Sequence, residues 1–290
     1  MIFTRIMRKL LEPLGRDDVE HFIDDIIIAT ETWEQHVEAV EAVLSRLEEV
    51  CMPAKPSKCY FGYAELDYLG HHVGQGMTKP DDEKTEKIKS AKKKTETKRE
   101  VRAFLGLAGF HRKYVSDYDN LSAPLTDLTK KGLPERVVWN EECEEAFTKL
   151  KQSLVCKPVL LLPDIDKPYT VRSDASDIAV GAVLLQDQGH GLQPVAYASR
   201  KLNKAERNYS VIEKECLGVV WSIKKFEQYL YSVHFTLETD HQPLTYLQKT
   251  KTENGRLMRW ALQLQQYSFT VKIIRGVYDV GVDYLSRLNN

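Results

Sequence analysis

The order of strand-like and helix-like segments in the last third of the chain constrains the fold most. Three segments with strand periodicity come first, YTVRSDAS (169–176), AVGAVLLQ (179–186) and PVAYASR (194–200), with turn residues between them. A long helical pattern follows from about Ala205 to Tyr229, and strand and helix patterns then alternate up to a final helix near Val282. A meander followed by alternating strands and helices predicts a mixed β-sheet covered by helices.

The upstream part of the chain has a different pattern. Residues 1–12 and 32–50 carry apolar side chains at helical spacing, and those of the first stretch are Ile2, Ile6, Leu10 and Leu11. Gly and aromatic residues alternate in YFGYAELDYLGHHVGQGM, which predicts a β-hairpin closed near Gly74 and Gly76. Another helix is expected after Trp139, because Asn140 is a favourable N-cap residue.

Composition sets only broad limits on function. The formal net charge is -1, so a nucleic-acid surface would have to be a local patch. No apolar stretch reaches the roughly 18 residues that a membrane span needs, and the N-terminus lacks a secretory cleavage pattern. We therefore expect an intracellular chain, cytoplasmic or nuclear, that is not secreted and has no membrane partner.

Four carboxylates in the last third occupy positions that favour a functional role. Asp174 and Asp240 each stand at the end of a predicted strand. Glu215 falls with Ile212 on the apolar stripe of the long helix, where a charged side chain needs a partner. Asp283 opens the last helix, where a negative charge suits the helix N-terminus.

Converging carboxylates repel one another unless cations neutralise them. Oxygen ligands suit hard ions such as Mg²⁺ or Mn²⁺. Two such ions about 3.5–4 Å apart catalyse in-line displacement at phosphorus, with one ion activating water and the other stabilising the leaving oxygen. The pattern thus favours a phosphodiester substrate.

Each of these residues also has a purely structural interpretation. Asp174 could cap the turn formed by D-A-S-D, and Asp283 could be an ordinary N-cap. Glu215 could pair with Lys214 or Lys224 on the surface. Three further aspartates in polar turns are interpreted as structural: Asp177, Asp187 and Asp279.

A second acidic feature is the pair Asp24 and Asp25 within the apolar, largely β-branched run FIDDIIIAT. Two adjacent carboxylates removed from water would be costly without a cation. Either a hairpin turn exposes them or something cationic lies nearby.

Taken together, these motifs resemble the ribonuclease H domain of gypsy-type long-terminal-repeat retrotransposon polyproteins. The resemblance rests on SDAS, YSVIEKECLGVVW, ETDHQPL and VDYLSR in that order. It implies that Asp174, Glu215, Asp240 and Asp283 hold two Mg²⁺ ions, with Mn²⁺ as an alternative. The implied reaction is endonucleolytic hydrolysis of RNA in an RNA–DNA hybrid, which leaves a 3′-hydroxyl and a 5′-phosphate.

The upstream chain resembles the reverse transcriptase of the same polyprotein. FIDDIII is similar to the Y/F-x-D-D motif, KPSKCYFG and LDYLGHHV to the palm and primer grip, and REVRAFLGLAGFHRKYV to the thumb. The implied fold is of the α+β or α/β class: a truncated palm (1–79), a thumb or connection-like helical region (80–160) and a ribonuclease H-like mixed sheet with flanking helices (161–290).

The resemblance implies that Asp24 and Asp25 lie on the turn of a palm hairpin and help to hold polymerase metals. The third aspartate of that site, and the fingers, would lie upstream of residue 1. We therefore expect the polymerase site to be incomplete and inactive in this chain unless the remaining palm and fingers of the polyprotein act as a partner.

Two features leave the function open. The family commonly has Pro-Gly-Lys-x-Asn before its last aspartate and Ala-Asp-Ala around it, whereas this chain has RGVYDVG and the larger Val282 and Tyr284. Displacement of Asp283 would weaken the site. The alternative to a nuclease is therefore an inactive nucleic-acid-binding module. The lysine-rich residues 84–102 are either a solvated face or a surface that contacts backbone phosphates.

Overall fold

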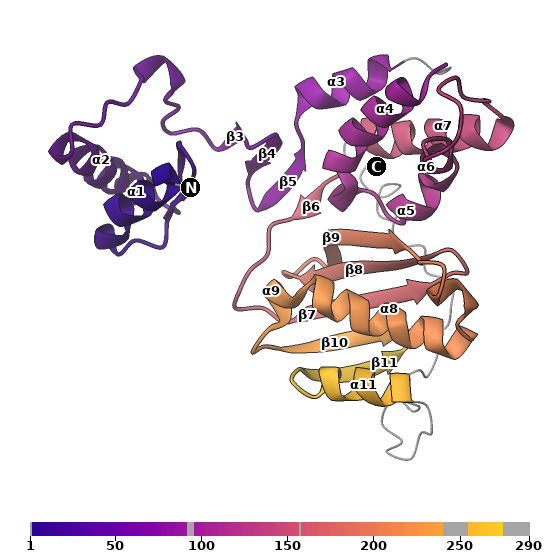
Figure 1. The fold of residues 1–290 in the computed structure, drawn as a ribbon. Coiled ribbons are helices and arrows are strands. Elements are labelled where there is room, and N and C mark those ends of the chain that lie inside the picture. Colours follow the sequence, from indigo (N-terminus) through magenta and orange to yellow (C-terminus); the bar gives the residue numbers. More distant parts are fainter. Residues whose placement is uncertain (1, 92–95, 157, 240–254, 275–290) are drawn as a thin grey trace. The chain divides into compact units, whose positions relative to one another are not determined.

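The computed structural model describes residues 2–91, 96–156, 158–239 and 255–274. The chain divides into two compact units, Met1–Ala64 and Glu65–Asn290 (Figure 1). Helices and strands alternate in a mixed α and β architecture with several sheets, which confirms the predicted class. Within the described residues, no helix combines the length and apolar character needed to cross a bilayer.

The first unit pairs helices with one short β-hairpin. Its elements are α1 (Ile2–Leu11), the 3₁₀ turn Glu12–Leu14, β1 (Val19–Phe22), β2 (Asp25–Ile28), α2 (Trp33–Glu49) and the 3₁₀ turn Pro56–Lys58. A capping box between Thr32 and Gln35 starts α2. Among the described residues of this unit, five buried side chains form one core cluster: Met7, Leu10, Leu11, Val43 and Leu47.

The helix predicted near the N-terminus is present, but its apolar stripe faces differently from the prediction. Ile2 and Ile6 are exposed, and Met7 is buried instead. Spacing alone did not tell which side of the helix the rest of the unit would cover.

The second unit begins with a small antiparallel sheet. Its strands are β3 (Glu65–Tyr68), β4 (His71–Gly74), β5 (Met77–Pro80) and β6 (Leu160–Leu161). The predicted hairpin is confirmed, since Gly74 pairs with Met77 and Gly76 has a φ of 73° that suits glycine. This sheet belongs to the second compact unit, which begins at Glu65. The predicted boundary between the palm segment (1–79) and the thumb-like segment (80–160) stays a prediction.

A helical region follows the hairpin. It consists of α3 (Asp82–Ser90), α4 (Lys98–Phe110), the 3₁₀ turn Arg112–Tyr114, α5 (Tyr118–Leu121), α6 (Ala123–Leu128) and α7 (Glu141–Val155). Asn140 caps α7 as predicted, with its Oδ1 accepting the Cys143 N–H at 2.9 Å. In the lysine-rich stretch, Lys98 is buried and donates to the Lys130 carbonyl at 2.9 Å, while residues 92–95 lie outside the described part.

The last part of the second unit is a five-stranded mixed sheet with the order β11-β10-β7-β8-β9. Strands β7, β8 and β9 form an antiparallel meander, and β10 pairs in parallel with both β7 and β11. The elements are β7 (Tyr169–Ala175), β8 (Ala179–Asp187), β9 (Leu192–Lys201), the 3₁₀ turn Glu206–Asn208, α8 (Val211–Lys225), α9 (Glu227–Leu230), β10 (His234–Thr239), α11 (Gly255–Leu264) and β11 (Ser268–Ile273).

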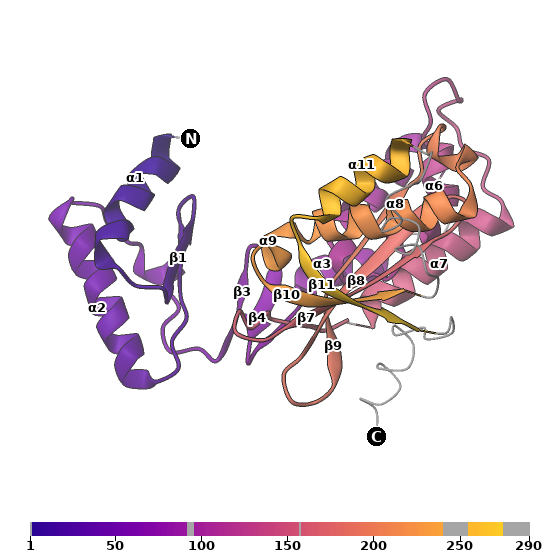
Figure 2. The same ribbon diagram turned by 90° about the horizontal axis from the view of Figure 1, so that it is seen from below.

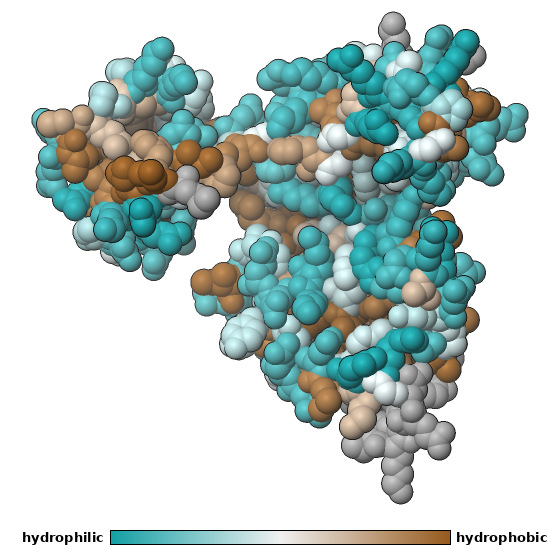
Figure 3. All heavy atoms as spheres, in the orientation of Figure 1, coloured by the Kyte–Doolittle hydropathy of each residue, from teal (hydrophilic) through white to brown (hydrophobic). Residues whose placement is uncertain are grey.

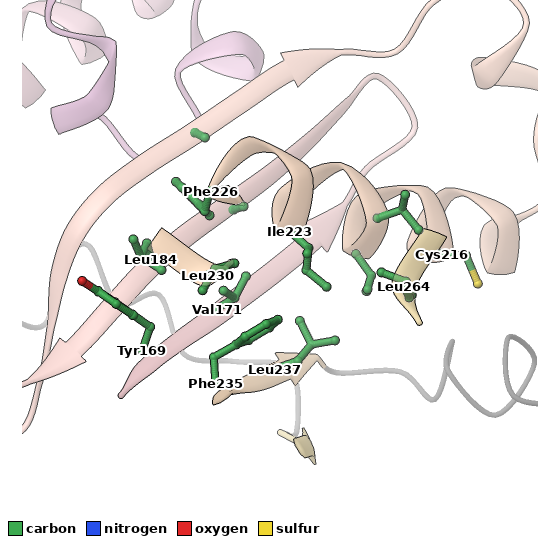
Figure 4. Packing of buried hydrophobic residues seen from close by; sticks show 14 of the residues in the cluster. Tyr169, Val171, Leu184, Cys216, Ile223, Phe226, Leu230, Phe235, Leu237 and Leu264 are labelled. Atoms are coloured by element: carbon green, nitrogen blue, oxygen red, sulfur yellow. The ribbon is translucent and has the colours of Figure 1, made fainter. Parts of the chain in front are cut away.

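Helices α8 and α11 lie on the same face of this sheet (Figure 2). Val171 and Leu237 of the sheet and Ile223 of α8 are fully buried between helix and sheet, and Phe235 packs beside them (Figure 4). The predicted helix from 205 to 229 is shorter than expected, because the α-helix runs from 211 to 225 and Ile212, assigned to its buried stripe, is 39% exposed.

The helical region packs on the edge strand β9. Arg112 donates to the Ser199 carbonyl at 2.6 Å, and the Ser199 hydroxyl donates to Asp119 at 2.8 Å. Lys201 donates to the Ala123 carbonyl at 3.2 Å. These contacts hold the start of α5 beside the end of β7, where the candidate site lies.

Candidate active site

Asp174 is the penultimate residue of β7, the central strand of the five-stranded sheet. Its side chain is exposed, and Oδ1 accepts the Ala175 N–H at 2.9 Å. The following turn is closed instead by Ser176, whose Oγ accepts the Ile178 N–H at 3.3 Å and the Ala179 N–H at 3.0 Å. The structure therefore gives the turn-capping role to Ser176 and leaves Asp174 at the strand exit.

Glu215 lies on the face of α8 that packs toward Asp174. Glu215 is only 6% exposed. Gly218, one turn later on the same face, lies so close to β7 that an added Cβ would stand 3.6 Å from the Asp174 carbonyl oxygen. The structure thus brings Asp174 and Glu215 to the same end of the sheet.

One of the two alternative partners for Glu215, Lys214, forms an ion pair with another carboxylate. Lys214 Nζ forms an ion pair with Asp177 Oδ1 at 2.7 Å. This contact explains Asp177 as a structural residue, as the sequence predicted. Asp187 is likewise structural, since its Oδ1 accepts the N–H groups of Gly189 and Gly191 at 2.8 and 3.0 Å.

A third carboxylate, Asp117, approaches this site from the helical region. Asp117 has a φ of 52° at the start of α5, and its Oδ1 lies 3.8 Å from where a Cβ on Gly181 would stand. Gly181 is the cross-strand partner of Asp174. Burial raises the pKa of Asp117, and the negative charge of Asp174 raises it further, against the hydrogen bond from Asn120. No local sequence pattern marks Asp117, because only tertiary packing brings it here.

A cluster of ionised side chains crosses three strands on the sheet face that carries Asp174. Glu238 on β10 is buried and accepts from Arg172 on β7 at 3.1 Å (Nε) and 2.6 Å (Nη2). Lys272 on β11 donates to its other oxygen at 3.1 Å. Burial alone would raise the pKa of Glu238, but these hydrogen bonds outweigh burial and hold that pKa below its usual value.

The remaining predicted ligands, Asp240 and Asp283, lie outside the described residues. Within the described ranges, no group of three or more His, Cys, Asp or Glu side chains is placed to hold a metal ion. The two predicted ligands that are described offer only carboxylate oxygens, and this donor chemistry fits Mg²⁺ or Mn²⁺ rather than a softer metal.

The pair Asp24 and Asp25 lies at an exposed hairpin turn, which settles the choice posed by the sequence. Phe22 pairs with Asp25, so Ile23 and Asp24 form a two-residue turn. Both aspartates are exposed. Ile23 has a φ of 57°, a left-handed conformation that is strained for a β-branched residue.

Two family descriptions match separate parts of the chain. Residues 164–267 match the RNase H-like domain found in reverse transcriptase. Residues 1–73 match reverse transcriptase, described as RNA-dependent DNA polymerase. The first match contains Asp174 and Glu215, and the second contains Asp24 and Asp25.

Curated relatives align over nearly the whole chain. The retrovirus-related Pol polyprotein from transposon 297 of Drosophila melanogaster is 38% identical over 99% of this chain. The transposon Tf2-3 polyprotein of Schizosaccharomyces pombe is 33% identical, also over 99%. The chain spans only 26% and 22% of the lengths of these two relatives.

Solved structures share the fold. A foamy viral protease-reverse transcriptase in complex with double-stranded DNA aligns with a TM-score of 0.83 and 22% identity, over 96% of this chain and 49% of that chain. The same kind of protein in complex with an RNA/DNA hybrid aligns with a TM-score of 0.80 and 22% identity, over 96% of this chain and 38% of that one. At this level of identity the likeness concerns the fold alone.

Proposed function

Because this chain belongs to the reverse transcriptase and RNase H-like region of retrotransposon Pol polyproteins, we propose that its residues 161–290 form a ribonuclease H domain. It would hydrolyse the RNA strand of an RNA–DNA hybrid with two divalent cations. Asp174, Glu215, Asp240 and Asp283 would hold the metals. The single observation that carries the proposal is the packing of the Glu215 face of α8 against the end of β7 that bears Asp174.

The strand register supports a third ligand at the same place. Strand β10 pairs in parallel with β7, and Glu238 is the register partner of Arg172. Asp240 follows Glu238 by two positions, as Asp174 follows Arg172. Each aspartate thus follows, by two positions in sequence, one member of the same cross-strand pair.

Bound divalent ions would activate a water molecule and stabilise the leaving oxygen of the phosphodiester. The contribution of the chain is to hold the carboxylates in place. The sheet supplies the rigid support, since the residues beneath Asp174 are fully buried. The exposed position of Asp174 gives an extended duplex access to it.

The substrate proposal follows from chemistry and from the fold. A hybrid duplex is recognised by groove shape and 2′-hydroxyl groups, so no base-reading motif is required. One of the structural neighbours holds an RNA/DNA hybrid. For the reverse transcriptase segment, we propose that Asp24 and Asp25 contribute to a polymerase site that further palm and finger residues of the polyprotein complete.

The second candidate function is binding of nucleic acid without cutting. The observation that favours it is the pair of large residues, Val282 and Tyr284, on either side of Asp283. Displacement of that carboxylate would cost metal affinity, while phosphate contacts elsewhere would be unaffected.

The test uses the purified chain, a labelled RNA–DNA hybrid and Mg²⁺, beside Asp174→Asn. Asp187→Asn is the matched control, because Asp187 ends β8 and accepts backbone N–H groups that an asparagine oxygen can still accept. Cutting by the parent and by Asp187→Asn, and none by Asp174→Asn, supports the nuclease. Binding without cutting by all three supports the binding module, and equal cutting by all three overturns the assignment of Asp174.

A further inference from the structure

The charged cluster of Arg172, Glu238 and Lys272 is not part of the metal-ligand set proposed above. Its three side chains come from three adjacent strands, and Glu238 is the register partner of both Arg172 and Lys272. Both nitrogens of Arg172 that bond Glu238 reach one oxygen, Oε2, while Lys272 reaches Oε1. Each carboxylate oxygen therefore has a cationic donor from a different neighbouring strand.

This arrangement depends on the strand register. The Glu238 side chain is 3% exposed, and a buried carboxylate without a cation is strongly unfavourable. A slip of one residue between β7 and β10 would turn Arg172 to the opposite face and leave Glu238 with Lys272 alone. The cluster thus penalises any other alignment of the two strands.

The position of the cluster connects it to the proposed site. The described pairing of β7 with β10 covers three residue pairs, and Arg172 with Glu238 is the last of them. Arg172 shares a strand face with Asp174, two residues further on. The ion pair therefore closes the ladder at the end from which the strands lead to the proposed ligands.

One feature indicates that the cluster is not optimised for stability alone. The remaining Arg172 nitrogen, Nη1, is buried and has no hydrogen-bond partner among the described residues. A buried donor without an acceptor is destabilising. Buried ion pairs can also often be replaced by apolar side chains with no loss of stability. Such a cluster is better explained by what it fixes than by the stability it adds.

We propose that Arg172 is a positioning residue of the nuclease site: through Glu238 it holds β7 and β10 in the register on which the metal-binding carboxylates depend. The inference rests on the proposed ribonuclease H function. It adds to that function a specific arginine that contacts neither metal nor substrate.

The test compares Arg172→Met with the double variant Arg172→Met/Glu238→Met. The single variant leaves the buried Glu238 carboxylate with Lys272 as its one cationic partner and should lower the melting temperature. The double variant removes both charges and should recover most of the thermal stability. The matched control is Arg200→Met/Glu206→Met, which removes a two-point ion pair (2.7 and 3.0 Å) at the end of β9.

Three measurements decide the outcome: amide hydrogen exchange of β7 and β10 without metal, calorimetric binding of Mn²⁺ alone, and kcat and KM on the hybrid. In the double variant we expect faster exchange at the β7–β10 end, roughly tenfold weaker Mn²⁺ binding and a similar loss in kcat with KM unchanged. The control should differ from wild type in none of these.

A double variant that matches wild type in amide hydrogen exchange of β7 and β10 and in Mn²⁺ affinity would overturn the positioning role of Arg172. This result is distinguishable from failure of the proposed function. If wild type itself cuts no hybrid, the nuclease assignment fails, while amide hydrogen exchange of β7 and β10 still tests the role of Arg172 in the strand register. If wild type cuts and the double variant cuts equally well, the nuclease stands and the role of Arg172 is lost.

Discussion

Two regions of this chain place aspartates next to a β-strand, and they support them very differently. Asp174 leaves the central strand of a five-stranded sheet. Asp24 and Asp25 occupy the turn of a two-stranded hairpin. A two-stranded ribbon is only marginally stable by itself, whereas a central strand is held from both sides. We infer that an acidic motif at a strand end becomes a rigid site only where neighbouring strands pair with that strand on both sides.

The cores of the two regions differ in the same direction. The five-stranded sheet rests on a cluster of 16 buried residues, whereas the described core cluster of the first unit has five. A band of apolar side chains also crosses the visible surface of the first unit (Figure 3). The exposed apolar residues of this unit include Ile2 at 71% and Val37 at 46%.

The largest expected difference between the regions is in catalysis. Glu215→Gln should reduce cleavage of an RNA–DNA hybrid by at least the roughly 100-fold that a change near a metal can cost, because it removes a buried anionic ligand. Asp25→Asn, at the exposed hairpin, should leave cleavage unchanged. Initial rates at saturating Mg²⁺ measure both. Equal losses in the two variants would break the contrast between the regions.

The next difference is in stability. Leu237→Ala, in the core beneath the five-stranded sheet, should lower the free energy of unfolding of the second unit by about 2–5 kcal/mol. Leu47→Ala, in the small core of the first unit, should cost less, because Leu47 has fewer buried neighbours to lose. Amide exchange of α8 and α2 reports each unit separately. A larger effect at Leu47 would contradict the comparison.

Lowering the pH should reduce the free energy of unfolding of the second unit more than that of the first. Burial lowers the pKa of His71 and of His111 in the second unit to about 4. The unfolded chain therefore binds more protons than the folded chain as pH falls from 6.5 toward 4, and stability falls with it. None of the buried residues described in the first unit is a histidine. Urea denaturation of each unit at pH 7 and pH 5 measures the change.

His111→Leu isolates this effect. His111 is fully buried, and neither ring nitrogen has a hydrogen-bond partner among the described residues. An apolar side chain of similar size should raise stability at pH 7 by about 1 kcal/mol and reduce the loss in acid. Destabilisation at pH 7 would show that the imidazole makes a favourable contact.

The smallest expected effect should be the same in both regions. Thr32 of α2 and Ser210 of α8 each form a capping box. Replacement of either by Ala should cost about 1 kcal/mol, because the interaction is local. Denaturation of each unit checks this, and a much larger loss at one cap would mean that tertiary contacts contribute there.

Much of the fold was predictable from local pattern. The strands β7, β8 and β9 begin and end within about one or two residues of the predicted segments, as is usual for element boundaries. The tight hairpin at Gly74 and the N-cap at Asn140 follow from residue chemistry alone. These features depend on neighbours in sequence, which the sequence displays directly.

The parts that could not be predicted depend on tertiary packing. Ile212 matched the helical stripe, yet it lies in the exposed first turn of α8. Asp117 reaches the site only because the helical region packs on β9. The bond between Arg172 and Glu238 depends on which strands become neighbours, and periodicity within a single strand does not encode that choice.

We propose that carboxylates remote in sequence form one divalent-metal nuclease site. The most direct measurement follows a labelled RNA strand in an RNA–DNA hybrid, an RNA duplex and a single strand, with Mg²⁺ and after chelation. We predict internal cuts with 5′-phosphate ends, only in the hybrid and only with the metal. Cuts that persist after chelation, or that remain in Asp174→Asn, would contradict it.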